Sequence, residues 1–462
     1  MSFLVSVVKK YSVLLFIVLV VLAASWPLFN AKMPFTHDFV HGARIAEMAR
    51  ALQDGHFPVR WSKNFSYGYG MPLFEFYAPF PFYLGAVFYL LGVPLVPSVK
   101  LIFLLATLLT AWGSYLLGRE LRGRWAGLLL TALITLAPYR ALNLFIRGAI
   151  SEIWGITAAV WVLYTTLLVL KHGKKSAPYL ILNLACLFLS HNLVTIIFLP
   201  FAALFTVGIF LIKNEEYRQG ISKGMYAIQQ GVVFAASYLL AIGVAAFYLF
   251  PAVLEKDYTK VEQMVITSYF NYHLHFLYIR QFFRPGWGYG GSEWGPNDPL
   301  SFFLGFGELF ACLLTIICVL FATARVIRQH KLNKALQPIA LALLFLALTA
   351  LSLFFTTEKS LFIWEHSGIL KFLQFPWRYL SSSLLFLGLS GIVWLWYLPT
   401  KLHAPVALLC IAITFACNTL YFKPEKFLDT PSALYYSDEN KIQAQMSGIL
   451  PDYIPKQLKL PI

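Results

Sequence analysis

Long apolar runs separated by short polar turns dominate the chain and indicate its architecture. Eleven of them approach the roughly 20 residues that an α-helix needs to cross a bilayer. We predict spanning helices at 11–29, 98–117, 125–138, 153–170, 177–190, 193–212, 231–251, 300–324, 337–355, 379–398 and 404–421. A further stretch, 72–97, is apolar enough to span but contains five prolines and Glu75.

The composition agrees with this pattern. Of 462 residues, 59% are apolar and 12% are charged, which predicts an all-α polytopic membrane protein with about eleven transmembrane helices. The five cysteines all lie in apolar runs, so neither a disulfide framework nor a CxxC metal site is present. The first run exceeds the roughly 7–15 residues of a signal-peptide core, so we expect an uncleaved anchor.

Charge gives the expected orientation. If 72–97 stays outside, the short loops that are rich in Lys and Arg all face the cytoplasm, as the positive-inside rule requires. Those loops hold 16 basic residues against three acids, Glu120, Glu215 and Glu216, in a chain of net charge +15. The basic charge is therefore a topology signal and gives no support to nucleic-acid binding.

On this topology four segments share the outer face. They are the first loop, 30–97, which we expect to contain interfacial helices, and the segments 139–152, 252–299 and 356–378. One transmembrane domain, 1–421, and a short external tail, 422–462, account for the chain, without an internal repeat. The unusual polar residues gather in the outer segments, so we expect the functional site there.

His37 and Asp38 follow directly after the first spanning helix. Asp38 is a candidate general base, because partial desolvation at the membrane edge can raise the basicity of a carboxylate. The alternative is an N-cap for a helix over 39–52, since Asp is a preferred cap residue. His37 and His41 could join Asp38 as metal ligands, but binding to lipid headgroups or carbonyls is the simpler explanation.

Several strings resemble known families. The order of Asp38, FEFY at 74–77, LGRELRGR at 117–124, and Arg147 with Glu152 resembles the N-terminal half of GT-C membrane glycosyltransferases. The prokaryotic membrane family labelled "6-pyruvoyl-tetrahydropterin synthase-related" is similar at GYGMPLF (68–74), YR (139–140), IRGAISE (146–152), SHN (190–192) and FPWRY (375–379). Nothing here supplies the metal site of a soluble pterin synthase. SGILPDYIP (447–455) resembles the junction to a larger external domain in longer relatives.

The resemblance implies a GT-C-like glycosyltransferase of the prokaryotic plasma membrane, with its active face external or periplasmic. The implied donor is a sugar on a polyprenyl phosphate, and the acceptor is a glycan, lipid or protein. Asp38 would be the catalytic base, and Glu152 a second acid that binds metal or organises the donor phosphate. Asp38 and Glu152 are the candidate ligands of a divalent cation. The alternative for Glu152 is a solvated helix start, where an acid is favoured by the dipole.

Arginines on the outer segments are candidate phosphate ligands, because the positive-inside bias gives no reason for them there. A guanidinium presents a planar fork that matches phosphate oxygens. Snorkelling to lipid headgroups is the alternative. Arg147, near Glu152, and Arg378, in a Pro-Trp-Arg sequence at a helix start, are the strongest candidates. The full set is Arg44, Arg60, Arg140, Arg147, Arg280, Arg284 and Arg378.

Two further features bear on substrate binding. The glycine-rich run 285–296 predicts a mobile lid, in which Trp287 could stack on a sugar ring. An interfacial aromatic belt would also explain Trp287. His191 lies in a tight outer turn, as a simple polar turn residue or as a contact to the acceptor.

Other functional classes remain open at this point. A transporter or flippase of a lipid-linked or polar envelope precursor is the main rival, and Glu308 inside a predicted span favours it. Glu308 could instead lie near the outer end and line the donor groove. The charged residues collect at one face and no repeat is visible, which favours the enzyme. A non-catalytic scaffold of envelope assembly is the third reading.

Overall fold

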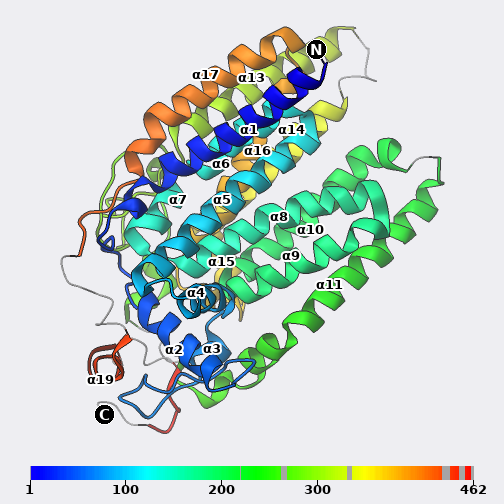
Figure 1. The fold of residues 1–462 in the computed structure, drawn as a ribbon. Helices are drawn as coiled ribbons and strands as arrows, with labels where there is room; N and C mark the ends of the chain where they lie inside the picture. The colour runs from blue at the N-terminus through cyan, green and yellow to red at the C-terminus, as the bar shows by residue number, and fades with distance from the viewer. Residues whose placement is uncertain are drawn as a thin grey trace.

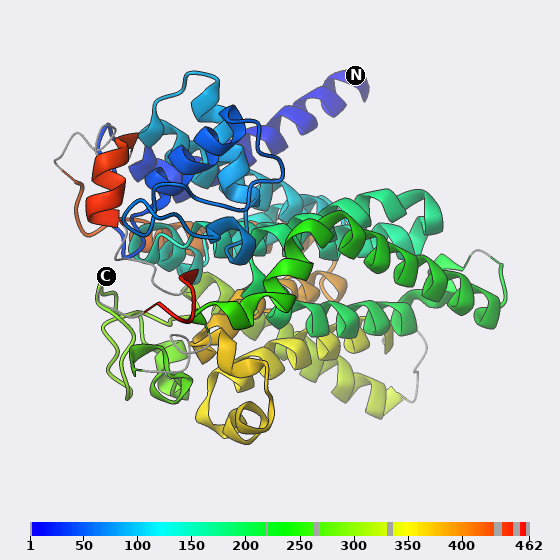
Figure 2. The same ribbon diagram turned by 90° about the horizontal axis from the view of Figure 1, so that it is seen from below.

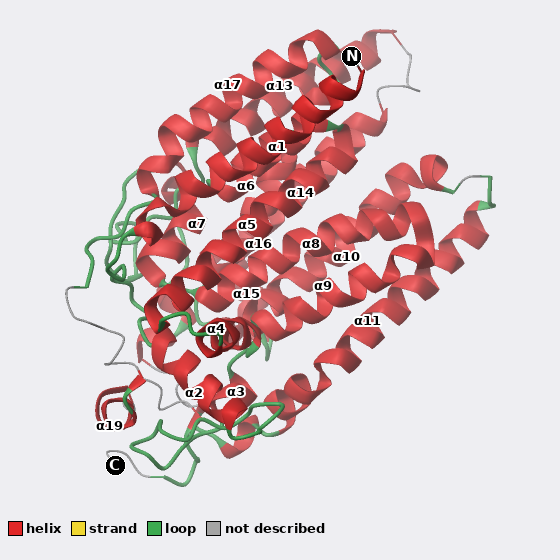
Figure 3. Ribbon diagram, in the orientation of Figure 1, coloured by secondary structure: helices red, strands yellow, loops and turns green. Residues whose placement is uncertain are grey.

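The computed structural model describes residues 2–218, 220–261, 268–329, 336–428, 437–446 and 453–458. Within these ranges the chain is helical, and its extended segments form only isolated β-bridges (Figure 3). The long helices run side by side along a common direction (Figure 1). Most of the string at 447–455 lies outside the described residues.

Nine helices of the described ranges are long and apolar enough to span a membrane. They are Tyr11–Phe29 (α1, Ser2–Ser25, with η1, Trp26–Phe29), Leu95–Arg122 (α5), Ile150–Ser190, Asn192–Tyr217 (α10), Lys223–Leu254 (α11), Phe306–Arg328 (in α13, Phe306–Gln329), Leu336–Thr356 (α14), Pro376–Trp396 and Thr400–Tyr421. Pro376–Trp396 contains α16 (Leu380–Ser390), and Thr400–Tyr421 contains α17 (Thr400–Asn418).

Two further details bring this number to the predicted eleven. The stretch Ile150–Ser190 contains two helices that pack against each other, α8 (Ile150–His172) and α9 (Ala177–Ser190). A bent pair, α6 (Arg124–Thr135) with Pro138–Arg147, forms one broken span. Counting α8 and α9 separately and the bent pair once gives eleven segments, so the predicted all-α polytopic fold is confirmed.

The two ends of the bundle differ as the charge pattern predicts. At one end, Arg124 donates to Ser12 Oγ at 2.9 Å, and Lys171 donates to Glu120 Oε1 at 2.7 Å. These contacts join helix ends that we expect on the cytoplasmic side. The first loop and the described parts of the tail and of the loop between α11 and α13 gather at the opposite end (Figure 2).

The first loop contains short helices, as predicted. They are α2 (His41–Gln53), α3 (Leu73–Phe76) and α4 (Phe80–Leu90). Because α4 has only 11 residues, it is too short to cross a bilayer. Within 72–94 the structure therefore has no helix long enough to span, and the spanning helix α5 begins at Leu95. Two other short helices complete this end, α15 (Leu361–His366) and α19 (Glu439–Lys441).

The predicted boundaries are wrong in two places that matter for the site. The segment 139–152 is not a loop, because it forms α7 (Pro138–Leu142), a π-helical turn, η2 (Asn143–Arg147), and the start of α8. The helix expected at 300 begins at Phe306, after Gly305 with φ +106°. Glu308 therefore lies in the first turn of α13, where Asn418 Nδ2 donates to both carboxylate oxygens at 3.0 and 2.7 Å.

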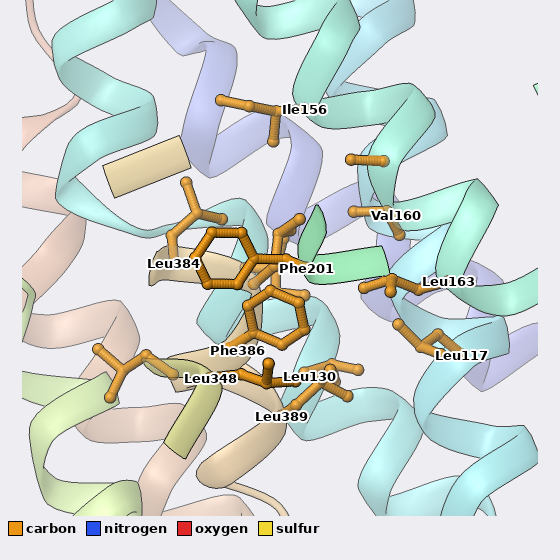
Figure 4. Close-up of a cluster of buried hydrophobic side chains, with 14 of the residues drawn as sticks. Leu117, Leu130, Ile156, Val160, Leu163, Phe201, Leu348, Leu384, Phe386 and Leu389 are labelled. Carbon is orange, nitrogen blue, oxygen red and sulfur yellow. The ribbon is translucent and has the colours of Figure 1, made fainter. Parts of the chain in front are cut away.

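Buried apolar side chains lock the helices that carry the site. Figure 4 shows Leu130 of α6, Val160 of α8, Phe201 of α10 and Phe386 of α16 meeting in one cluster, in which the Phe201 and Phe386 rings are 5.7 Å apart. Such close packing has low compressibility, so the helices cannot shift much relative to one another. The start of α8 and the start of α16 are thereby held in fixed relation at the loop-rich end.

Candidate active site

The segment that carries Asp38 is docked on the break before α8. The Asp38 backbone N–H donates to the Arg147 carbonyl at 2.9 Å. Gly148 makes this approach possible, because its φ is +65° and a Cβ at this position would lie 2.4 Å from Thr36 Oγ1. The interruption between η2 and α8 at Gly148 thus places Asp38 beside Arg147.

Asp38 does not cap the helix that follows. Helix α2 begins at His41, and its N-cap residue is Val40, without a side-chain cap hydrogen bond. The prediction of Asp38 as a cap is therefore wrong. Asp38 Oδ2 instead accepts a hydrogen bond from Arg44 Nη1 at 3.1 Å and lies 3.8 Å from His41 Nε2.

The partners of Asp38 are more deeply buried than Asp38 itself. The Arg44 side chain is 2% exposed and lies over the Tyr77 ring at 4.3 Å, whereas the Asp38 side chain is 29% exposed. His41 is buried and hydrogen-bonded to the Gly148 carbonyl. One face of the Asp38 carboxylate is therefore held by protein while the other remains accessible.

The charge state of this cluster differs from our expectation. Burial alone would raise the pKa of the Asp38 carboxyl, but the charge and hydrogen bond of Arg44 outweigh it, and the pKa lies below its usual value. Burial lowers the pKa of His41, so the imidazole is neutral at pH 7. Arg44 therefore keeps Asp38 ionised, and the expected rise in basicity by desolvation is wrong.

Glu152 forms a second cluster, in the first turn of α8. Its side chain is 1% exposed, and Oε2 accepts from Arg147 Nη1 at 2.7 Å. Oε1 accepts from the Tyr139 hydroxyl at 2.5 Å and from Asn143 Nδ2 at 3.5 Å. The predicted pairing of Arg147 with Glu152 is present, and Glu152 is not a solvated helix start.

Arg378 reaches the same carboxylate from a distant part of the chain. It lies in η10 (Pro376–Tyr379), just before α16, and its Nε is 3.9 Å from Glu152 Oε2. Its Nη1 donates to the Leu373 carbonyl at 2.7 Å. The guanidinium of Arg147 lies over the Trp377 ring at 4.6 Å. The two strongest phosphate candidates are thus brought together around one acid.

The glycine-rich run covers this region. His37 Nε2 lies 2.9 Å from the Tyr289 carbonyl, and Ser292 Oγ accepts from Trp377 Nε1 at 3.1 Å. A Cβ on Gly288 would lie 2.0 Å from the Pro299 carbonyl oxygen. Glycine is therefore needed here for close backbone approach. Motion of the run as a lid stays a prediction.

Of the other predicted site residues, His191 lies close enough to Glu152, Arg378 and Arg147 for their charges to act on it, whereas the rest are scattered. Arg140 is fully buried and donates to Thr110 Oγ1 at 3.0 Å and to Thr107 Oγ1 at 3.3 Å, so it lies inside the bundle. His191 caps α10 through Nδ1, which accepts from the Val194 N–H at 2.9 Å. Residues at the surface or partly buried in the outer loops are Arg60, Arg280, Arg284 and Trp287.

The donor set for a divalent cation does not fit. Across the described residues no three His, Cys, Asp or Glu side chains come close enough to hold a metal ion. Asp38 and Glu152 each face an arginine, whose charge opposes a cation. We therefore derive no step through a metal.

Sequence reasoning missed Tyr139 and Asn143 as site residues. Both contact Glu152, and Asn143 also accepts from Arg147. The signal was the spacing, since Asn143 and Arg147 are four residues apart and share a face in a helix. Treating 139–152 as a loop concealed that relation.

Comparisons with known proteins agree with the predicted resemblance. Residues 74–295 match the family described as "6-pyruvoyl-tetrahydropterin synthase related domain; membrane protein". A comparison with curated proteins finds no match. The arabinofuranosyltransferase AftD from Mycobacteria superposes with a TM-score of 0.51 and 15% identity, covering 91% of this chain and 28% of AftD.

Two other structures are more distant. They are an Archaeoglobus fulgidus oligosaccharyltransferase (TM-score 0.47, 15% identity, 94% of this chain and 59% of that one) and Cupriavidus metallidurans ArnT bound to undecaprenyl phosphate (0.35, 12%, 83% and 78%). The likeness to AftD shows a GT-C-like membrane fold, as the sequence resemblance predicts. The chain spans less than a third of the length of AftD.

Proposed function

We propose that this GT-C-like membrane protein is a glycosyltransferase that moves a sugar from a polyprenyl-phosphate-linked donor to an acceptor hydroxyl. The observation that carries the proposal is the juxtaposition of an accessible, ionised Asp38 with the buried cluster of Glu152, Arg147 and Arg378. Glycosyl transfer from a lipid phosphate needs both parts: a base for the acceptor and cations for the departing phosphate.

Arg147 and Arg378 are the proposed phosphate ligands. Arg147 contacts Glu152 and Asn143 through Nη1 alone, so Nη2 takes no part in those bonds. The Nε of Arg378 is buried without a hydrogen-bond partner. A phosphate oxygen at this point would satisfy it, and Glu152 would hold both guanidiniums in position.

Asp38 is the proposed general base. The acceptor oxygen forms a bond to the anomeric carbon while the bond from that carbon to the phosphate oxygen breaks. The acceptor proton passes to the Asp38 carboxylate, and the lipid phosphate leaves as an anion held by the two arginines. Because Arg44 keeps Asp38 ionised, the carboxylate is available at neutral pH.

The proposed active face is external, in the plasma membrane of a prokaryote. Support comes from the clustering of basic turns at the end of the bundle opposite to Asp38. Single cysteines at Tyr69, which is 79% exposed in the first loop, and at Arg122 test it. We expect an impermeant thiol reagent to label the first from outside and not the second; the reverse pattern would contradict the orientation.

A panel of labelled polyprenyl-phosphate sugars, incubated with the purified protein and candidate acceptors, tests the activity. Asp38→Asn is the control, because the amide is nearly isosteric but cannot accept the proton. We expect transfer by the wild type and a loss of about 10²–10⁴-fold in the variant. Vesicle uptake of the same lipids without transfer would favour a transporter, the class for which Glu308 gave a sequence signal. Lipid binding with neither transfer nor uptake would favour a scaffold.

A further inference from the structure

The loop between α11 and α13 lines a cavity that is partly open to solvent and lies outside the two carboxylate clusters. Its volume is about 270 Å³. Its walls include Gln281, Arg284, Trp287, Tyr289, Asp298 and Phe302. This is the small end of the range for ligand pockets, roughly 300–1,000 Å³. It suits one or two sugar rings, and it is too small for a polyprenyl chain or a folded protein segment.

The polar lining is built by buried contacts. Gln281 is 5% exposed, and its Nε2 donates to Asp298 Oδ2 at 2.9 Å. Asp298 Oδ1 accepts from the Glu293 N–H at 2.5 Å. Burial raises the pKa of Asp298 to about 6, so the carboxylate is ionised at neutral pH. It is fixed in place with lone pairs that can accept hydroxyl protons.

The charge and shape of the lining select the ligand. One acid, Asp298, and one cation, Arg284, balance each other, which disfavours a free anion or cation. Carboxylate, amide and guanidinium groups beside the aromatic faces of Trp287 and Tyr289 match a ring that carries hydroxyl groups.

The cavity adjoins both clusters. The backbone carbonyl of Tyr289, a wall residue, is hydrogen-bonded to Nε2 of His37, the neighbour of Asp38. Phe302, on another wall, packs against Trp377 with the ring centres 5.6 Å apart, and Trp377 lies under Arg147. A sugar ring in this cavity would therefore be separated from the proposed reaction centre by a single layer of side chains.

We infer that this cavity is a sugar-binding subsite, occupied by a ring of the acceptor glycan or of the donor. The inference rests on the proposed function for its role, but the binding itself is testable without turnover. Two sources share the same chemistry, so the experiment needs two arms.

In the first arm, saturation-transfer NMR measures binding of soluble oligosaccharides to the full chain in detergent. In the second, the protein binds a polyprenyl-phosphate sugar or the same polyprenyl phosphate without sugar. Each arm compares the wild type with Trp287→Ala and Asp298→Asn. The matched control is Trp294→Ala, in the same run, with a side chain 76% exposed and outside the cavity walls.

We expect Trp287→Ala and Asp298→Asn to weaken sugar binding about tenfold or more, the loss that one charged hydrogen bond or aromatic contact implies, and Trp294→Ala to leave it unchanged. An effect in the first arm identifies the acceptor as the source. An effect on the sugar-bearing lipid alone identifies the donor. If no saccharide or sugar-lipid binding depends on Trp287 or Asp298, the subsite is overturned, even where the wild type still transfers sugar.

Discussion

The two carboxylates of the outer end, Asp38 and Glu152, have similar partners but opposite surroundings. Each accepts from an arginine, Arg44 at 3.1 Å or Arg147 at 2.7 Å. The Asp38 side chain is 29% exposed, whereas that of Glu152 is 1% exposed and is also bonded to Tyr139. A buried carboxylate with all its hydrogen-bond positions occupied orients its neighbours, whereas an accessible carboxylate can contact a substrate.

The difference follows from where each residue lies. Glu152 belongs to the first turn of a buried helix, so every lone pair must find a partner within the protein. Asp38 lies in a loop that is held by backbone bonds, so its side chain needs fewer partners. The comparison assigns positioning to Glu152 and proton acceptance to Asp38, and substitutions at both clusters test that division.

Removing the buried acid should have the largest effect on stability. Glu152→Ala leaves Arg147 and Arg378 without their counter-charge, so we expect the free energy of unfolding to fall by about 3–5 kcal/mol. Denaturation in detergent measures it. Glu120→Ala is the control, since its pair with the 41%-exposed Lys171 should contribute less than about 1 kcal/mol. Equal losses in both variants would remove the positioning role.

The second largest effect should come from replacing the guanidinium groups of Arg147 and Arg378 with lysine ammonium groups, which should weaken donor binding. Arg147→Lys and Arg378→Lys keep the charge but lose paired hydrogen bonds, so we expect the affinity for a polyprenyl-phosphate analogue to fall about tenfold. Arg122→Lys, at the opposite end of the bundle, should leave it unchanged. Lipid-headgroup snorkelling, which tolerates Lys, would predict equal affinities in all three.

Arg44→Gln should shift the acid limb of the pH–rate profile. In the wild type the pKa of Asp38 is lowered, so the ionised form persists until the pH falls below the usual Asp range. Without Arg44, burial raises the pKa with little to oppose it, and activity should be lost at a higher pH than in the wild type. The same sign holds for stability, because the Asp38–Arg44 pair stabilises the fold above that range and is lost as pH falls. An unmoved acid limb would mean that Asp38 is not the group that titrates.

His191→Ala should have the smallest effect. His191 accepts from the Val194 N–H as a helix cap, so we expect a loss of about 1 kcal/mol in stability and no change in donor affinity. Isothermal titration measures the donor affinity and thermal unfolding measures the stability, so the two effects can be separated. A fall in donor affinity at unchanged stability would move His191 into the substrate site.

Much of the fold could be predicted from apolar runs and charge, because bilayer thickness and the positive-inside rule act on long segments. The π-helical turn before Gly148 could not, since backbone bonds from His37 and Asp38 of the first loop hold its carbonyls. Because that turn was unrecognised, Asn143 was overlooked and Tyr139 was placed in a loop.

The site was predicted unevenly for similar reasons. The pairing of Arg147 with Glu152 follows from short sequence separation, and the approach of Arg378 was suggested only by its motif. Arg140 was expected at a phosphate but packs among threonines of α5, because a helix replaces the predicted loop. Charge compensation at Asp38 required knowing that Arg44 is buried beside it.

Single-turnover transfer by Asp38→Asn, measured beside donor binding by the same variant, tests the division of roles most directly. The account predicts a chemical step slowed by about 10²–10⁴-fold with donor affinity within about twofold of the wild type. A variant that transfers sugar at the wild-type rate, or that loses donor binding in proportion to its rate, would contradict Asp38 as the base.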